Sequence, residues 1–199
     1  MTPLPQDLLP HEAPPPSGRP AALADAFQAL VPTIETARTR LRAPRIEDFG
    51  AWAAILCSPR AVHMGGPYAR DDAFDEFASY VAGWFLRGFG PWTVEARDGA
   101  EVLGFVHVGF EPSDHEPELG WLFLPAAEGR GLALEASEAA RDWARVQLIP
   151  SLVSYVGPEN DRSHRLARRL GADRDPAAEA AFAGTPDADT AVFRHWGRA

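Results

Sequence analysis

Two glycines set two residues apart, Gly129 and Gly131, are the residues of this sequence whose spacing most suggests chemistry. They follow an apolar segment, residues 118–124, and precede the amphipathic pattern of a helix that starts near Leu132. Bare backbone at a helix N-terminus presents unpaired N–H groups, which bind anions and most often phosphate. The spacing therefore predicts a site for a phosphate-bearing cofactor, with an ordinary strand-to-helix connection as the alternative.

The other reactive side chains do not fit the motifs of other chemistries. His115 and Glu116 are followed by a proline and lack the second histidine of a zinc-protease helix, and the remaining histidines show no metal-ligand spacing. The segment 129–131 is too short for a dinucleotide fingerprint, and no Walker loop or nucleophile elbow occurs. Cys57 falls near an apolar helix face, which favours a core position. We therefore expect no metal and no cysteine nucleophile.

The elements that must position the glycine turn lie in one domain behind an N-terminal tail. Seven prolines fall within the first 20 residues, a density that predicts an extended or disordered chain. Residues 21–30 carry a helically spaced apolar stripe of Leu23, Phe27 and Leu30, which could dock on the domain. A length of 199 residues favours a single domain. We divide the chain into a flexible proline-rich tail, 1–35, and a domain, 36–199.

Within the domain, strand and helix patterns alternate. The segment 118–124 is almost wholly apolar, which is typical of a central strand covered on both faces. The crossover from it to residues 152–156 predicts a parallel pair. The predicted elements are a strand near 38–42, a helix from Pro44 to before Ser58, a helix capped by Asp71 or Asp72 and ended by Gly88, a hairpin of 92–96 and 102–110, the strand 118–124, a helix from Leu132, the strand 152–156, a short helix capped by Asn160 or Asp161 and ended by Gly171, a loop over 173–189 and a strand at 191–196.

Composition and charge exclude several classes of partner. The formal charge of −9 argues against nucleic acid, whose phosphates require a basic surface. No apolar run approaches the roughly 18 residues that span a bilayer, and the N-terminus lacks the pattern of a signal peptide. A single cysteine excludes an intrachain disulfide. We expect a cytoplasmic protein with no nucleic-acid or membrane partner.

The order of these elements resembles the GNAT superfamily of acetyl-CoA-dependent N-acetyltransferases, in particular the branch of ribosomal-protein N-terminal acetyltransferases. Residues 128–133 are similar to the family's Gln/Arg-x-x-Gly-x-Gly/Ala turn, and residues 134–136 resemble its helix entry. Asn160 and Ser163 match its following short helix. The resemblance covers residue 37 to the C-terminus. It implies an α/β (α+β) fold, with a mixed, mostly antiparallel central sheet flanked by helices and a parallel strand pair at the cofactor site.

The resemblance also implies where acetyl-CoA binds. The pantetheine arm would follow Leu122, Phe123 and Leu124, where the family's strand parts from its parallel neighbour and an exposed N–H can polarise the thioester carbonyl. Asn160 and Ser163 would complete the site. The pyrophosphate would lie on the backbone N–H groups of Gly129, Arg130, Gly131, Leu132 and Ala133, with the Arg130 side chain adding positive charge.

Two positions depart from the family pattern. Glu128 stands where glutamine or arginine is usual, and a carboxylate near a pyrophosphate must turn outward or pair with Arg130. Ala167 stands where many relatives carry a tyrosine that protonates the departing thiolate. The resemblance suggests Ser163 as the substitute, with capping of its helix as its alternative role. A thiol pKa of about 8.5 makes the thiolate a tolerable leaving group without full protonation.

Acyl transfer to an amine requires the amine to be neutral, and a general base contributes about 10²- to 10⁴-fold to the rate. Glu118 matches a position where relatives carry a catalytic glutamate, and an ordinary strand residue is the alternative. The neighbouring Asp114, His115 and Glu116 would bind a cationic amine or relay its proton, or would form a solvated loop. Residues 60–68 and 111–117 are expected to shape the acceptor pocket.

We therefore predict an N-acetyltransferase that transfers acetyl from acetyl-CoA to a primary amine by direct attack in a ternary complex. The acceptor is a peptide or protein N-terminus, or a small-molecule amine such as a polyamine or an antibiotic. A homodimer is one oligomeric state open to it. The alternative is a non-catalytic acyl-CoA-binding module on the same fold, in which Glu128 and Ala167 mark the loss of the chemistry.

Overall fold

The apolar segments of the sequence form one eight-stranded sheet in the computed structural model, which describes residues 9–197. The strands follow the order β1-β2-β3-β4-β5-β6-β8-β7, and every neighbouring pair is antiparallel except β5 and β6. This arrangement confirms the predicted mixed fold and the central place of the strand that precedes the glycine turn. The strands are β1 (Ile34–Glu35), β2 (Thr39–Arg42), β3 (Pro91–Ala96), β4 (Val102–Gly109), β5 (Glu118–Phe123), β6 (Leu152–Val156), β7 (Asp173–Arg174) and β8 (Ala191–Trp196).

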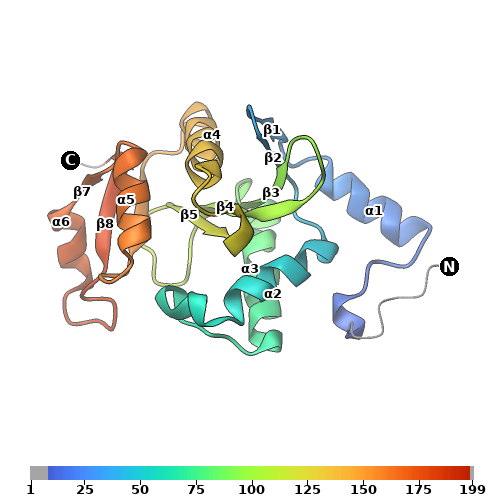
Figure 1. Cartoon of the computed structure of the whole chain (residues 1–199), viewed down its shortest axis with the longest axis horizontal. Coiled ribbons are helices and arrows are strands. Elements are labelled where there is room, and N and C mark those ends of the chain that lie inside the picture. The colour runs from blue at the N-terminus through green and yellow to red at the C-terminus, as the bar shows by residue number, and fades with distance from the viewer. Residues whose placement is uncertain (1–8, 198–199) are drawn as a thin grey trace.

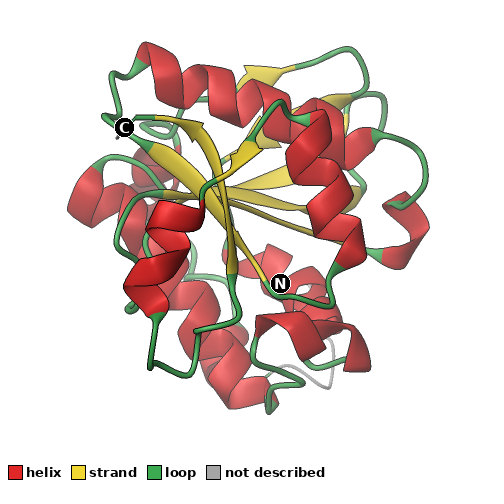
Figure 2. Ribbon diagram, turned by 90° about the vertical axis from the view of Figure 1, so that its left-hand side faces the viewer, coloured by secondary structure: helices red, strands yellow, loops and turns green. Residues whose placement is uncertain are grey.

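Helices cover both faces of the sheet (Figure 1). One face carries α4 (Leu132–Val146), and α5 (Asp161–Arg169) lies beside it. The other face carries α2 (Phe49–Leu56) and α3 (Arg70–Arg87). The turned view in Figure 2 shows helices on both sides of the sheet. The buried face of α4 is lined by small residues with no exposed surface, so the helix lies close to the strands; these residues are Ala136, Ser137, Ala140 and Ala144.

The aromatic residues of α2 and α3 form most of the second core. The Trp52 ring lies 5.6 Å from that of Phe77 on α3 and 5.0 Å from that of Phe105 on β4. The predicted core role of the α3 stripe is confirmed for Phe77, which is buried. It is wrong for Phe85, which is 78% exposed, whereas the neighbouring Trp84 packs against the core. Gly88 ends α3 in the left-handed conformation, as predicted.

Short 3-10 segments connect several of these elements. The helix expected to start at Pro44 begins instead with η2 (Ile46–Asp48). The N-cap of α3 is Ala69, so Asp71 and Asp72 stand in its first turn rather than cap it. The other connections are η3 (Pro59–Met64) and η4 (Pro125–Ala127). No helix within residues 9–197 is both long and apolar enough to cross a membrane.

The part of the proline-rich segment that the structure describes is not simply extended. Its first eight residues lie outside the described range. Glu12, in η1 (Pro10–Glu12), is 2% exposed and accepts hydrogen bonds from Arg70 at 2.6 and 2.9 Å. The extended conformation expected up to residue 20 is therefore wrong at η1.

Helix α1 (Arg19–Gln28) begins inside the proline-rich stretch, because Pro20 falls in its first turn, where no backbone N–H is needed. Its apolar stripe does not dock as expected: Leu23 is 57% exposed and Leu30 78%, and Phe27 reaches only the exposed ring of Phe85. The sheet then starts at β1, just before the expected domain boundary at residue 36.

The segment 173–189, expected to be a loop, contains β7, α6 (Pro176–Glu179) and η5 (Ala180–Phe182). Asp175 caps α6 by accepting a hydrogen bond from the Ala178 N–H at 3.0 Å, and Pro176 occupies the first turn. Phe182 is buried against β6 and β8. The Asp175-Pro176 pair therefore starts a helix within the segment that was expected to be a loop.

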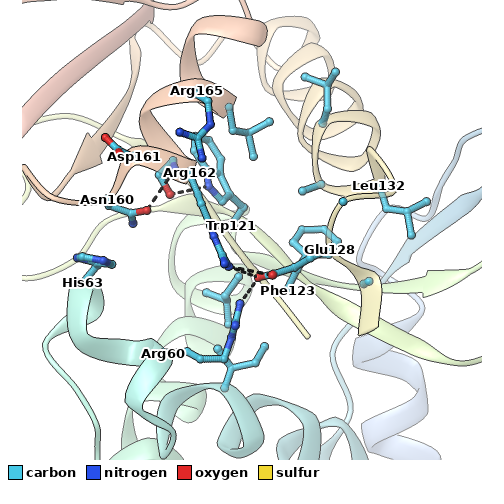
Figure 3. A pocket seen from close by; sticks show the side chains of 18 of the residues that line it. Arg60, His63, Trp121, Phe123, Glu128, Leu132, Asn160, Asp161, Arg162 and Arg165 are labelled. Atoms are coloured by element: carbon cyan, nitrogen blue, oxygen red, sulfur yellow. Dashed lines mark hydrogen bonds and ion pairs between the residues drawn. The ribbon is translucent and has the colours of Figure 1, made fainter. Parts of the chain in front are cut away.

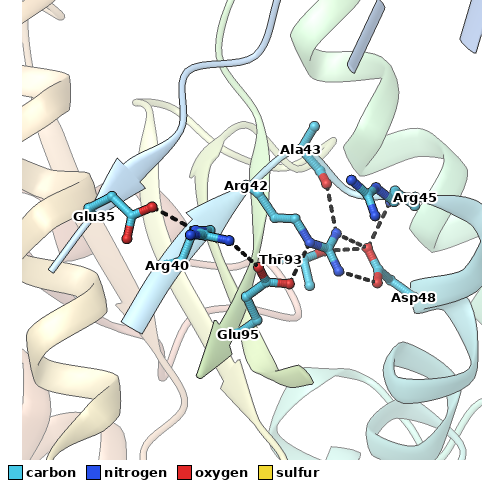
Figure 4. Close-up of polar contacts among 8 residues, drawn as sticks. All are labelled: Glu35, Arg40, Arg42, Ala43, Arg45, Asp48, Thr93 and Glu95. Carbon is cyan, nitrogen blue, oxygen red and sulfur yellow. Dashed lines mark hydrogen bonds and ion pairs between the residues drawn. The ribbon is translucent and has the colours of Figure 1, made fainter. Parts of the chain in front are cut away.

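A buried ionic network ties β2 and β3 to the start of α2 (Figure 4). The Arg42 guanidinium donates to both carboxylate oxygens of Asp48, at 2.7 and 2.9 Å, and to Glu95 at 2.7 Å. Thr93 and the Arg45 N–H donate to the same Asp48 carboxylate. Because each buried charge has a partner, this network holds the α2 side of the fold in register with the sheet.

Candidate functional site

The parallel pair β5 and β6 opens immediately after it begins. Only Glu118 and Val153 are paired in register, and the Leu119 carbonyl accepts a hydrogen bond from the Ser154 hydroxyl at 2.7 Å. Beyond Leu119, β5 continues to pair with β4 but has no paired strand on its β6 side. The strands therefore diverge at the middle of the sheet, as the resemblance implied.

This divergence leaves backbone groups of β5 without a strand partner. Successive residues of a strand direct their N–H and C=O groups to opposite neighbours. Since the Leu119 carbonyl faces β6, the backbone groups of Trp121 and Phe123 face the same side, where the gap has opened. Their N–H groups are placed to donate to a guest bound between the strands.

The glycine turn lies at the end of β5, where α4 starts. Gly129 and Gly131 have φ angles of +70° and +76°, which side chains other than glycine rarely adopt. Gly131 is the N-cap of α4, and no side chain caps the helix. The N–H groups of the first turn thus have no intrahelical partner, and the helix dipole adds positive potential there.

Arg38, just before β2, positions this turn and was missed in the sequence. Its guanidinium donates to the Arg130 carbonyl at 2.8 Å and to the Glu135 carboxylate at 2.7 Å. Glu135 also accepts from the Thr36 hydroxyl at 2.6 Å. These contacts cross from the sheet to the first turn of α4, so Arg38 holds the turn against the N-terminal strands. Its sequence separation from the turn hid this role.

A cavity of about 1120 Å³ opens beside the turn (Figure 3). Its walls come from β5, the glycine turn, the N-terminus of α4, η3 and α5. Three arginines of α5 line it at helical spacing, Arg162, Arg165 and Arg169, and Arg60 lies opposite on η3. The cavity is large for a ligand site, and its cations and free N–H groups suit an extended anionic guest.

Glu128 faces into this cavity instead of turning outward. Its carboxylate is paired with Arg60 on one side and accepts hydrogen bonds from Arg162 on the other, at 2.8 and 3.0 Å (Figure 3). The expected partner, Arg130, is not involved. The three side chains thus form a bridge across the cavity, which an anionic guest would have to share or open.

Most of the predicted cofactor residues meet at this cavity, and two do not. Leu124 packs with the α2 and α3 core, and its N–H donates to the Leu103 carbonyl at 2.9 Å. Arg130 is not part of the cavity wall, so its predicted contact through the side chain has no support here. The predicted residues that do line the cavity are Leu122, Phe123, Gly129, Gly131, Leu132, Ala133, Asn160 and Ser163.

Asn160 caps α5, and this frees Ser163 from the capping role considered for it. The Asn160 carboxamide oxygen accepts the Ser163 N–H at 3.2 Å. The Ser163 hydroxyl oxygen accepts the Trp121 indole N–H at 3.2 Å, so its own proton can be donated to a guest. Ala167 is fully buried and supplies no polar group.

A second cavity, of about 370 Å³, lies on the α2 and α3 side of the opened strands. Glu118 lines it, together with Tyr80, His107 and Asp114. The His107 ring lies where Gly120 has no side chain, since a Cβ there would approach the His107 Nδ1 to 2.4 Å. Burial lowers the pKa of His107 to about 4, so the ring is neutral at neutral pH.

Glu118 is 8% exposed and lies in surroundings that disfavour its charged form. Burial raises its pKa well above the usual range, and the negative charges of Glu111 and Asp114 raise it further. The Tyr155 N–H, which donates to Glu118 at 3.4 Å, opposes this shift. A buried carboxyl with a raised pKa, in a cavity wall, has the properties of a proton acceptor for a cationic guest.

The residues of the loop before β5 make different contacts. Asp114 lines the second cavity and accepts the Glu111 N–H at 2.6 Å. Glu116 instead accepts hydrogen bonds from Arg194 at 2.7 and 3.0 Å, and His115 packs on the Phe182 ring. Neither of the last two lines the second cavity, so a relay through them finds no support in its wall.

The two cavities share part of their walls. The shared residues lie where β5 leaves β6, with contributions from η3 and the start of α5. A guest held along the first cavity would therefore end at the wall of the second, near Glu118. The shared residues are His63, Met64, Trp121, Leu122, Asn160 and Ser163.

Comparison with known proteins agrees with this geometry. Residues 38–173 match the family model of the acetyltransferase (GNAT) domain. The chain is 26% identical over 168 residues to the ribosomal protein uS5-alanine N-acetyltransferase of Escherichia coli K12, a match that covers 77% of this chain and 85% of that protein.

Among solved structures, the chain is similar to an acetyltransferase from Agrobacterium tumefaciens strain C58, with a TM-score of 0.76 and 36% identity over 83% of this chain and 95% of that one. It shares its fold with the ribosomal L7/L12 α-N-protein acetyltransferase RimL in complex with coenzyme A, with a TM-score of 0.65 and 14% identity over 83% of this chain and 98% of that one. From the family match and these relatives, the chain belongs to the GNAT family of N-acetyltransferases and is a distant homologue of the ribosomal-protein acetyltransferases.

Proposed function

We propose that this chain transfers the acetyl group of acetyl-CoA to a primary amine by direct attack, with both substrates bound at once. The observation that carries the proposal is the common wall of the two cavities. One cavity suits a long anionic thioester and the other a small cationic guest. Their junction is the place where a thioester carbonyl and an amine nitrogen would meet.

The first cavity has the groups that coenzyme A requires. The N–H groups of the glycine turn and the first turn of α4 would bind the pyrophosphate, and the arginines of α5 would neutralise the remaining phosphate charge. The pantetheine arm would follow Leu122 and Phe123 between the opened strands. The backbone N–H of Trp121 or Phe123 would donate to the thioester oxygen as charge develops on it.

Glu118 and Ser163 act on opposite sides of the reacting carbon in this proposal. An ammonium group that enters the second cavity lowers the pKa of Glu118, because it compensates the nearby negative charges. The Glu118 carboxylate then accepts the proton of the amine, and the nitrogen forms the amide bond while the carbon–sulfur bond breaks. The thiolate leaves with the electron pair, takes up the second proton that the nitrogen releases as it becomes the amide, and accepts a hydrogen bond from the Ser163 hydroxyl.

Initial-rate kinetics test this proposal. Thiol release should require both acetyl-CoA and an amine, and reciprocal plots at several amine concentrations should intersect. Parallel lines would indicate a covalent acetyl-enzyme and would contradict direct attack. Calorimetric binding of acetyl-CoA without turnover of any amine would instead favour a non-catalytic acyl-CoA-binding module.

A further inference from the structure

We propose that the acceptor is a small organic dication, an amine that carries a second cationic group a few bonds from the nitrogen that reacts. This inference rests on the proposed function, because it names the substrate class of the same second cavity. Its basis is the charge, the unpaired polar atoms and the aromatic walls of that cavity.

The cavity wall carries carboxylates from four parts of the chain and no arginine or lysine. Its two histidines do not supply a compensating pair of cations, since buried His107 is neutral at neutral pH. Within residues 9–197, none of these carboxylates forms an ion pair with an arginine. The carboxylates are Glu76, Glu111, Asp114, Glu118 and Asp187.

Buried carboxylates elsewhere in the described part of the chain do have arginine partners. The buried carboxylates elsewhere each meet a guanidinium: Glu12 meets Arg70, Asp48 meets Arg42, and Glu116 meets Arg194. Buried charges are normally paired in this way because desolvation is costly. In the second cavity Glu118 is buried and Glu76 and Asp114 are half-buried, all without such a partner, whereas Glu111 and Asp187 are exposed. A compensating cation for the buried and half-buried carboxylates would come from outside the chain.

The carboxylates are too many for one ammonium group. Glu118 lies at the opened strands, where the reacting amine must sit. Glu111 belongs to a second group: its N–H donates to Asp114, and its carboxylate accepts the Tyr80 hydroxyl. Burial and the charges of Glu111 and Asp187 raise the pKa of Asp114 to about 7, so these groups repel one another. A second cation beside them would relieve that repulsion.

Two buried polar atoms in the same wall point independently to a guest. The Trp52 indole N–H and the His107 Nε2 have no hydrogen-bond partner among the described residues, although the side chains are only 2% and 5% exposed. Native structures leave few such atoms unsatisfied. Both line this cavity. An ammonium group would donate to the His107 Nε2 in its unprotonated form, and a water bound with the guest would accept the Trp52 N–H.

Aromatic walls fit the same guest. The side chains of Trp52, Tyr68, Tyr80 and Tyr155 line a space of about 370 Å³, which suits a short carbon chain. Aromatic faces attract ammonium groups through the ring quadrupole. A small diamine satisfies the charge, the rings and the size together, whereas an ordinary peptide N-terminus brings a single cation.

Calorimetry with four probes tests the inference without requiring turnover. The protein, saturated with coenzyme A, is titrated with 1,4-diaminobutane, 4-amino-1-butanol, 4-aminobutanoate and trialanine amide. We expect diaminobutane to bind about tenfold more tightly than the amino alcohol and about 100-fold more tightly than the amino acid. Comparable affinities for the first three probes, no binding of diaminobutane, or tighter binding of the peptide would overturn the inference.

Variants locate the second cation. Glu76→Gln and Asp114→Asn should each reduce the affinity ratio of diaminobutane to aminobutanol by about threefold or more. Asp142→Asn is the matched control, since Asp142 lies on α4, outside the second cavity, with its side chain 67% exposed; the ratio should not change. An unchanged ratio in both cavity variants would overturn the assignment.

Thiol release is measured separately from binding. Thiol release from acetyl-CoA with diaminobutane would support both proposals. Selective binding of diaminobutane without thiol release would contradict the proposed function and leave the dication site standing. Acetylation of all the amines, with equal affinity for each, would support the proposed function and contradict the dication site.

Discussion

Replacement of Glu118 by glutamine is the perturbation that best isolates the proposed proton transfer. The side chain is 8% exposed and keeps its size in the variant, so the cavity shape should hold. Loss of a general base costs about 10²- to 10⁴-fold in rate. We expect kcat to fall by that amount while the affinity for acetyl-CoA, bound in the other cavity, stays nearly constant.

The same assignment predicts the direction in which the rate changes with pH. The pKa of Glu118 is raised by burial and by the charges of Glu111 and Asp114, and a base acts only when deprotonated. The kcat/KM of the unaltered protein should therefore rise with pH through this raised pKa. The Glu118→Gln variant should lose that rising limb. Asp114→Asn should shift the limb to lower pH, because it removes one of the charges that raise the pKa.

The assay is thiol release at saturating acetyl-CoA, followed from about pH 6 to 9, with heat-unfolding curves as the control for folding. A rate and a pH limb that survive in Glu118→Gln would refute the assignment of the base. A limb that moves upward in Asp114→Asn would refute the electrostatic reasoning.

Four further predictions concern affinity and stability. The difference in free energy of unfolding between the Glu118→Gln variant and the unaltered protein should shift in favour of the variant as pH rises from about 4 to neutral. The pKa of Glu118 is raised in the folded state, so this residue binds more protons folded than unfolded, and its contribution to stability falls as pH rises above its usual pKa. A difference between the two proteins that is independent of pH would contradict this. Glu128→Gln should tighten coenzyme A binding about fivefold by calorimetry, because it frees Arg60 and Arg162 and removes a negative charge from the cavity; weaker binding would show that the bridge organises the site. Gly131→Val should abolish coenzyme A binding, because valine is strained at a φ of +76° by about 1–3 kcal/mol and the turn must move; retained affinity would exclude the turn as the pyrophosphate site. Arg42→Met should cost about 3–5 kcal/mol in urea unfolding, since it leaves Asp48 without a guanidinium and Glu95 with only that of Arg40, at 3.4 Å, and a smaller loss would mean that water reaches those carboxylates.

The parts of the fold that were predictable from the sequence depend on local signals. The glycine turn, the Asn160 cap and the hairpin of residues 92–110 each need only a few neighbouring residues. The apolar run of β5 also indicated its central position, because a strand covered on both faces has no polar alternation. These elements place the first cavity, which is why most of the predicted cofactor residues line it.

The second cavity could not be predicted in the same way, because its residues are far apart in the chain. Glu76 comes from α3, Glu111 from the loop after β4, and Asp187 from the segment before β8. The partners of Glu128 were missed for the same reason, since Arg60 is 68 residues away. Only the arginines of α5 had a readable signal, the helical spacing of Arg162, Arg165 and Arg169.

A structure of the protein crystallised with coenzyme A and 1,4-diaminobutane tests the central claim most directly. The account predicts the pyrophosphate on the N–H groups of the turn at Gly129 and Gly131, the sulfur beside the Ser163 hydroxyl, and one nitrogen of the diamine against Glu118. A pyrophosphate bound away from the glycine turn, or a sulfur that does not reach the wall shared by the two cavities, would contradict it.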